Sequence, residues 1–227
     1  TNSRRGSTQW KLGDHFLGCP SGAAAEGLRN IAHRHDSVVR LLADMLHGVF
    51  KFSIRTSRRD NATTPHNGQC TDICAARMVP PDPVPLMIDV TIIVSTAASY
   101  TATAKSASRL GINAFLGNEG DEEKRKKHGA NARAMACELV PFSLDVRGAL
   151  GPSAKRFWDG LWKSHIANAP SRGESKWTAI AERRKWLQRF SVLLATENAE
   201  ILMTKAGAYW NKHGAERSAF LLQRLRG

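Results

Sequence analysis

The pattern of apolar and polar residues predicts two helices in the first two thirds of the chain. The first follows Asp36 or Ser37, either of which can cap a helix, and its apolar side chains recur every three or four positions. These side chains are Val38, Leu41, Leu42, Met45, Leu46 and Val49. The second is a charged helix from about Glu119 to Ala136, with acids near its start as the helix dipole favours.

In the last third of the chain, the pattern of apolar residues predicts two further helices. A glycine turn at 148–151 leads into a helix with Phe157, Leu161 and Trp162 on its apolar side. A longer helix is expected from Lys176 to about Ala206. We expect these helices to form a C-terminal extension.

Strands are predicted between these helices by short runs rich in aliphatic and β-branched residues. The runs are 50–54, 70–77, 86–95 and 139–146. Prolines at 80–85 cannot donate to a ladder, so this segment is a turn and the strands on either side of it should be neighbours. Residues 56–69 indicate a loop, and the small side chains of 96–118 indicate a loose helix plus loop.

The net charge of the chain indicates which class of partner it binds. The 33 Lys and Arg residues against 20 Asp and Glu give a formal net charge of +13, which favours a polyanionic partner, nucleic acid first of all. No run of about 18 apolar residues is present, so no membrane span is predicted. The four cysteines are irregularly spaced, which indicates reduced thiols rather than a disulfide framework.

Two aspartates stand out against this pattern. Asp89 lies inside the apolar run from Leu86 to Val94, where burying a charged carboxylate costs several kcal/mol unless it has a partner, a metal or a shifted pKa. Asp72 lies at the start of the neighbouring strand. Two acids at adjacent strand ends predict a divalent-metal site, and the alternative is a pair of structural acids that accept hydrogen bonds from loop amides.

Six short motifs occur in a recognisable order. They are His15-Phe16-Leu17-Gly18-Cys19 followed by Arg34-His35-Asp36, then Thr71-Asp72-Ile73, Asp89-Val90-Thr91, Glu123 through Lys127-His128, and Val140-Pro141-Phe142 through Gly148-Ala149-Leu150-Gly151. In this order they resemble the C-terminal endonuclease domain of site-specific non-LTR retrotransposons, a branch of the PD-(D/E)xK nucleases. The resemblance covers about residues 13–205. It departs from the family at Cys70-Thr71, where Arg-Pro is usual, at Thr91, where most PD-(D/E)xK nucleases have lysine, and at His128, where tyrosine is usual.

The resemblance implies an α/β fold with a restriction-endonuclease-like αβββαβ core and a mixed sheet. It implies a basic arm with the remnant of a zinc knuckle at 1–27, the endonuclease-like core at 28–150 and the helical extension at 151–227. Asp72 and Asp89 would hold Mg²⁺, with Lys124 or Lys127, or less favourably Lys105, completing the site. His15 and Cys19 would be the last two zinc ligands of a Cys-Cys-His-Cys knuckle, but no earlier cysteine pair precedes them here.

Two functions follow from the charge and the resemblance. The first is a domesticated domain that binds RNA as a structural component of a large ribonucleoprotein, such as a mitochondrial ribosome, among neighbouring proteins. The alternative is an active Mg²⁺-dependent DNA-nicking endonuclease, located in the nucleus. In either case the expected phosphate-binding residues are Arg4, Arg5, Lys155, Arg156, Arg183, Arg184, Lys185, Arg189, Arg224 and Arg226.

Overall fold

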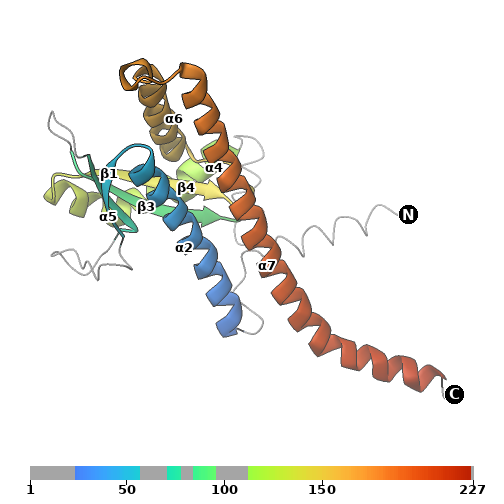
Figure 1. Ribbon diagram of the computed structural model, residues 1–227. Coiled ribbons are helices and arrows are strands. Elements are labelled where there is room, and N and C mark those ends of the chain that lie inside the picture. The colour runs from blue at the N-terminus through green and yellow to red at the C-terminus, as the bar shows by residue number, and fades with distance from the viewer. Residues whose placement is uncertain (1–23, 57–70, 78–83, 96–111, 226–227) are drawn as a thin grey trace.

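A four-stranded mixed β-sheet forms the centre of the protein (Figure 1). The computed structural model describes residues 24–56, 71–77, 84–95 and 112–225. The strands are β1 (Phe52–Thr56), β2 (Ile73–Arg77), β3 (Leu86–Ile93) and β4 (Glu138–Asp145), in the order β1-β2-β3-β4. The pairs β1–β2 and β2–β3 are antiparallel, and β4 runs parallel to β3. The predicted α/β class and the pairing of the two strands around the proline-rich segment are confirmed.

One face of the sheet is covered by three long helices. They are α2 (Ala24–Gly48), α6 (Pro152–Ala167) and α7 (Lys176–Leu225). Side chains alternate between the two faces of a strand, and Val140, Phe142 and Leu144 of β4 all point into the core that these helices close. The core also contains Leu42 from α2 and Trp162 from α6, both 0% exposed. The two C-terminal helices therefore share one core with the sheet.

The opposite face of β4 meets a second helical unit. It consists of α4 (Ile112–Leu116), the π-helix η2 (Gly117–Asp121) and α5 (Glu122–Ala134), which follow one another without a break. The side chain of Ser143 donates to an Asp121 carboxylate oxygen, and the other oxygen accepts the Ser153 N–H at 2.8 Å. A buried, hydrogen-bonded acid thus links η2 to β4 and to the start of α6, and this link fixes where α5 begins. A short 3₁₀-helix, η3 (Pro170–Arg172), precedes α7.

Two helix boundaries were predicted wrongly. Helix α2 begins at Ala24, so Asp36 and Ser37 lie inside it and neither caps it. Strong helix formers, among them Ala24 and Ala25, extend the helix toward its N-terminus. Helix α7 continues to Leu225 instead of ending near residue 206, because its last turns are rich in Ala, Glu, Arg and Leu and contain no proline.

The first strand begins two residues later than predicted. Lys51 adopts a left-handed backbone conformation with a φ of 57°, which turns the chain out of α2 before the ladder starts at Phe52. The strand lies at the edge of the sheet. No helix within the described parts of the chain is long and apolar enough to cross a lipid bilayer.

Candidate functional site

The sheet brings the two predicted acids together. The register pairs Ile73 of β2 with Ile88 of β3, so its continuation by one residue sets Asp72 opposite Asp89. Asp72 Oδ2 accepts the backbone N–H of Val90 at 2.7 Å, which ties the carboxylate to the neighbouring strand. Asp89 itself is 5% exposed. Two acids that lie 17 positions apart in sequence therefore meet across one strand pair.

Helix α5 supplies a lysine to Asp89. Lys124 Nζ lies 2.7 Å from Asp89 Oδ2, and the side chains of the two residues are 14% and 6% exposed. The two groups form a largely buried ion pair. Lys127, the other candidate, is exposed on α5, and within the described residues it forms no ion pair with either acid. Of the candidate lysines that the structure describes, Lys124 is the one that lies at Asp89.

His128 lies one helical turn after Lys124 and faces the same acid. It is 0% exposed, and its Nε2 lies 3.7 Å from Asp89 Oδ1. Neither ring nitrogen has a hydrogen-bond partner among the described residues. Burial lowers the pKa of His128 below its ordinary value, and the charges of Lys127 and Lys124 lower it further, although Asp89 acts in the opposite direction. The imidazole is therefore mainly neutral at pH 7.

His35 of α2 supports the other acid. Its Nε2 lies 3.3 Å from Asp72 Oδ2 and 3.2 Å from the carbonyl oxygen of Val90. Burial by itself would lower the pKa of His35, but the hydrogen bond and charge of Asp72, aided by the Val90 carbonyl, raise it above the ordinary value. The N–H of Val90 and the ring of His35 together hold the Asp72 carboxylate in one orientation.

Sequence reasoning did not identify His35 or His128 as site residues. His35 belongs to the Arg34-His35-Asp36 motif, which was assigned to a helix start and not to the acids. His128 ends the charged run of α5 that begins at Glu122. Each histidine lies in a motif that the sequence analysis had already singled out. The sequence did not show that α2 and α5 approach the same end of β3, which is what brings both histidines to the acids.

The donor set suits a hard divalent cation. Asp72 and Asp89 offer carboxylate oxygens, and Asp89 Oδ2 has the Lys124 ammonium beside it but no aligned hydrogen bond among the described residues. No three-membered group of His, Cys, Asp or Glu with ligand atoms within 4.8 Å of one another includes these acids in the part of the chain that the structure describes. Two carboxylates completed by water and substrate oxygens are a usual arrangement for Mg²⁺, which keeps several of its waters. The residues present fit magnesium rather than zinc.

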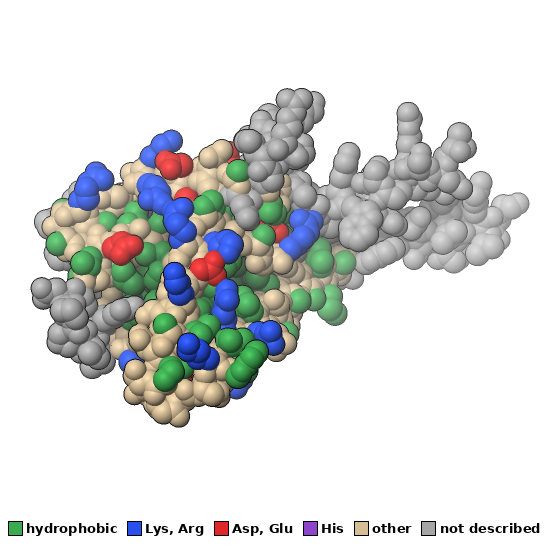
Figure 2. Space-filling model, turned by 90° about the horizontal axis from the view of Figure 1, so that it is seen from above, with side chains coloured by type: hydrophobic (Ala, Val, Ile, Leu, Met, Phe, Trp, Pro, Cys, Tyr) green, Lys and Arg blue, Asp and Glu red, His purple; other side chains and the backbone are tan. Residues whose placement is uncertain are grey.

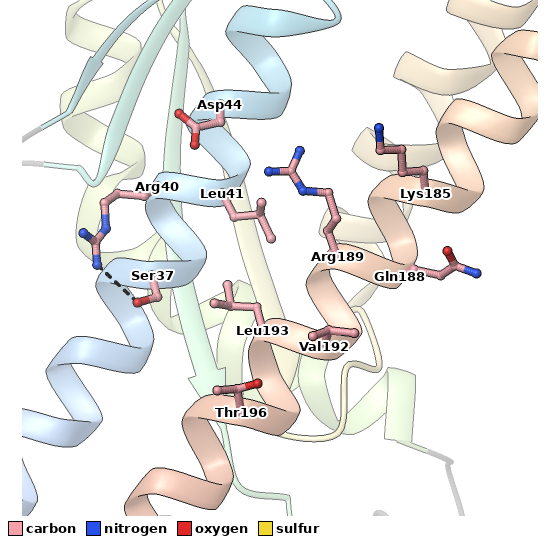
Figure 3. A pocket seen from close by; sticks show the side chains of 10 residues that line it. All are labelled: Ser37, Arg40, Leu41, Asp44, Lys185, Gln188, Arg189, Val192, Leu193 and Thr196. Atoms are coloured by element: carbon pink, nitrogen blue, oxygen red, sulfur yellow. Dashed lines mark hydrogen bonds between the residues drawn. The ribbon is translucent and has the colours of Figure 1, made fainter.

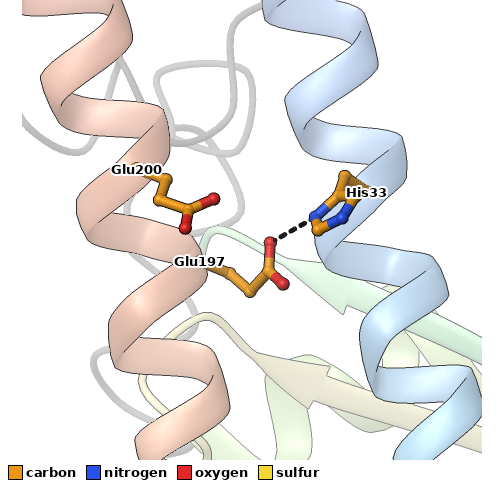
Figure 4. A group of neighbouring side chains, drawn as sticks. All are labelled: His33, Glu197 and Glu200. Carbon is orange, nitrogen blue, oxygen red and sulfur yellow. Dashed lines mark hydrogen bonds and ion pairs between the residues drawn. The ribbon is translucent and has the colours of Figure 1, made fainter.

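A group of three potential ligands does occur where α2 and α7 meet. His33, Glu197 and Glu200 have their ligand atoms within 4.8 Å of one another (Figure 4). His33 Nδ1 lies 2.9 Å from Glu197 Oε2, so the two satisfy each other. Beside them, buried Arg34 donates to Asn198 at 2.8 Å, and burial lowers its pKa to about 10 despite nearby acids. This is a polar contact that holds two helices together.

The predicted phosphate-binding residues divide into two sets. Lys155 and Arg183 both form ion pairs with Asp159 of α6, and Arg156 donates to Ser153 Oγ at 3.2 Å. The other set, on α7, is exposed and consists of Arg184, Lys185 and Arg189. Seen from above, the molecule presents more Lys and Arg side chains than Asp and Glu (Figure 2). The first set is engaged in the fold, and the second is available to a partner.

Several predicted residues lie outside the described part of the chain. They are Arg4, Arg5, His15, Cys19, Lys105, Arg226 and the side chain of Arg224.

No protein-family model matches this chain, and no curated protein matches it.

Proposed function

We propose that this chain is a metal-dependent nuclease domain that hydrolyses phosphodiester bonds at Asp72, Asp89 and Lys124. Its fold would be the restriction-endonuclease-like core of the non-LTR retrotransposon endonucleases that its motifs resemble. The observation that carries the proposal is the 2.7 Å approach of Lys124 Nζ to Asp89 Oδ2, with Asp72 opposite in the strand register. Two acids and one lysine are the minimal set of a PD-(D/E)xK site. Here α5 supplies the lysine, because position 91 is threonine.

The chain's own residues would divide the chemistry among them. A divalent cation on Asp72 and Asp89 would polarise the scissile phosphate and lower the pKa of a bound water. His35 and the Val90 amide keep Asp72 oriented, which is how the partners of a metal ligand usually act. Lys124 stands beside Asp89 and would stabilise the negative charge that develops on the phosphate oxygens.

A second candidate function is nucleic-acid binding without cleavage, and one observation favours it. The ammonium of Lys124 already neutralises Asp89, and Asp72 Oδ2 is already engaged by the Val90 amide and His35. Such a site would be a stable structural feature of a basic domain. The chain would then bind structured RNA mainly by shape and phosphate contacts, as a component of a ribonucleoprotein such as a mitochondrial ribosome.

A pair of matched lysine variants tests the proposed nuclease. Nicking of supercoiled DNA with Mg²⁺ or Mn²⁺ is compared for the native chain, Lys124→Gln and Lys127→Gln. Both variants remove one charge from α5, but only Lys124 lies at Asp89. We expect Lys124→Gln to slow nicking about 10²–10³-fold, Lys127→Gln to stay within a few-fold of native, and EDTA to stop the reaction.

The alternatives give different results in the same assay. If the native chain leaves the plasmid supercoiled with both metals yet binds RNA with a steep salt dependence, the binding function is the correct one. Equal rates for Lys124→Gln and the native chain would show that nicking does not depend on this lysine. Circular dichroism of each variant establishes that equal amounts of folded protein are compared.

A further inference from the structure

A groove runs along the outside of the α2–α7 layer (Figure 3). Its volume is about 690 Å³. From α2 it is lined by Ser37, Arg40, Leu41 and Asp44, and from α7 by Lys185, Gln188, Arg189, Val192, Leu193 and Thr196. On a helical wheel, Leu41 and Asp44 lie on the side of α2 away from His35. The groove is therefore separate from the site at Asp72 and Asp89.

The cations of the groove are exposed. Within the described residues, none of Arg40, Lys185 and Arg189 forms an ion pair, whereas Lys155 and Arg183 share Asp159. An exposed, unpaired cation is available to an external anion at little desolvation cost. Asp44, also exposed, is the one acid among the lining residues.

Two of these cations are already held in place. The guanidinium of Arg189 stacks over the ring of Trp186, 4.2 Å from its centroid, which restricts the orientation of the planar group. Arg40 donates to the Asp36 carbonyl at 3.3 Å and to Ser37 Oγ at 3.2 Å, and further N–H groups remain on its guanidinium. Guanidinium groups fixed in this way suit phosphate oxygens, which they bind in pairs.

The remaining lining also favours a phosphate chain over a protein helix. Gln188 and Thr196 add neutral hydrogen-bonding groups of the kind that contact phosphate and sugar. The apolar side chains of the lining are Leu41, Val192 and Leu193, and they lie among four charged side chains, whereas a docked amphipathic helix needs a continuous row of apolar anchor pockets. The chain as a whole carries +13, so a regularly charged polyanion fits better than an acidic peptide.

We propose that this groove binds the phosphodiester backbone of a nucleic-acid segment other than the one at the cleavage site. The inference rests on the proposed function in taking nucleic acid as the ligand. Arg40, Lys185 and Arg189 contact phosphates, and Asp44 weakens the attraction. The groove holds a flanking part of the substrate, so it contributes to affinity and not to the chemical step.

Binding of labelled nucleic acid in EDTA tests the groove without cleavage. Fluorescence anisotropy over a range of salt concentrations is measured for a duplex and a single strand. We expect Lys185→Ala with Arg189→Ala to weaken binding about tenfold or more at 0.1 M salt, and the slope of log K against log salt to become shallower by about one per lost contact. Asp44→Asn is expected to strengthen binding. The matched control is Lys163→Ala, which removes an exposed charge of α6 that does not line the groove.

Several outcomes would overturn the inference. Unchanged affinity and salt slope in the double variant, or an equal loss in Lys163→Ala, would show that the groove is not a specific contact. Loss of binding to labelled polyglutamate with unchanged binding to nucleic acid would identify an acidic protein partner instead. The two proposals fail separately: a native chain that never nicks DNA but loses affinity on groove substitution would contradict only the nuclease.

Discussion

Asp89→Asn is expected to reduce metal-dependent nicking by about 10³-fold or more. Asparagine keeps the shape of the side chain but removes the negative charge that would hold the cation. The residue is central because its carboxylate is buried, meets Lys124 at 2.7 Å and stands opposite Asp72. The measurement is the initial nicking rate of supercoiled DNA at equal concentrations of folded protein. A control, Asp159→Asn, removes a carboxylate that pairs with Lys155 and Arg183 on the helical layer and should nick at the native rate.

Unfolding of Asp89→Asn would also abolish nicking. A second variant therefore distinguishes a loss of folding from a loss of catalysis. Removing the charge of Asp89 leaves Lys124, with a side chain only 14% exposed, without its partner, and breaking a buried pair costs about 3–5 kcal/mol. The double variant Asp89→Asn with Lys124→Met removes both charges and should recover most of that stability. We expect it to melt near the native temperature and still not nick. Nicking by Asp89→Asn at the native rate would exclude a metal at this carboxylate.

Much of the sheet could be predicted from local patterns. The prolines at 80–85 forbid a ladder, so the strands around them had to meet, and they pair as β2 and β3. The position of Asp89 within an apolar run marked it as a buried acid in need of a partner. Both inferences use only the chemistry of neighbouring residues, and both agree with the structure.

The composition of the site could not be predicted in the same way. The spacing in α5 offered Lys124 and Lys127 equally, and only the orientation of the helix against β3 places Lys124 at Asp89. His35 belongs to a helix whose start was misplaced at Asp36, because a good capping residue also occurs inside helices. Contacts between segments distant in sequence decide such details, and no local pattern contains them.

The orientation of α5 depends on a close contact between η2 and β4, which the sequence also could not indicate. A Cβ built on Gly120, in η2, would lie 2.6 Å from Ser143 Cβ and 3.1 Å from Ile93 Cδ1. Ser143 Cβ is fixed to β4, so η2 would have to move away from the sheet, and the buried hydrogen bond from Ser143 to Asp121 would be strained. Because α5 follows η2 directly, the same movement would shift Lys124 from Asp89.

Gly120→Ala is therefore expected to lower the free energy of unfolding by about 3 kcal/mol, from overpacking and the strained buried hydrogen bond. It should also slow nicking at temperatures where the protein remains folded. Gly160→Ala is the matched control, because nothing lies within 4 Å of a Cβ built at this exposed position inside α6, and alanine should stabilise the helix by about 0.5–1 kcal/mol. Urea unfolding followed by circular dichroism gives both values. Equal stability of the two variants would show that η2 does not hold α5 against the sheet, whereas normal nicking by a destabilised Gly120→Ala would show that the site tolerates the shift.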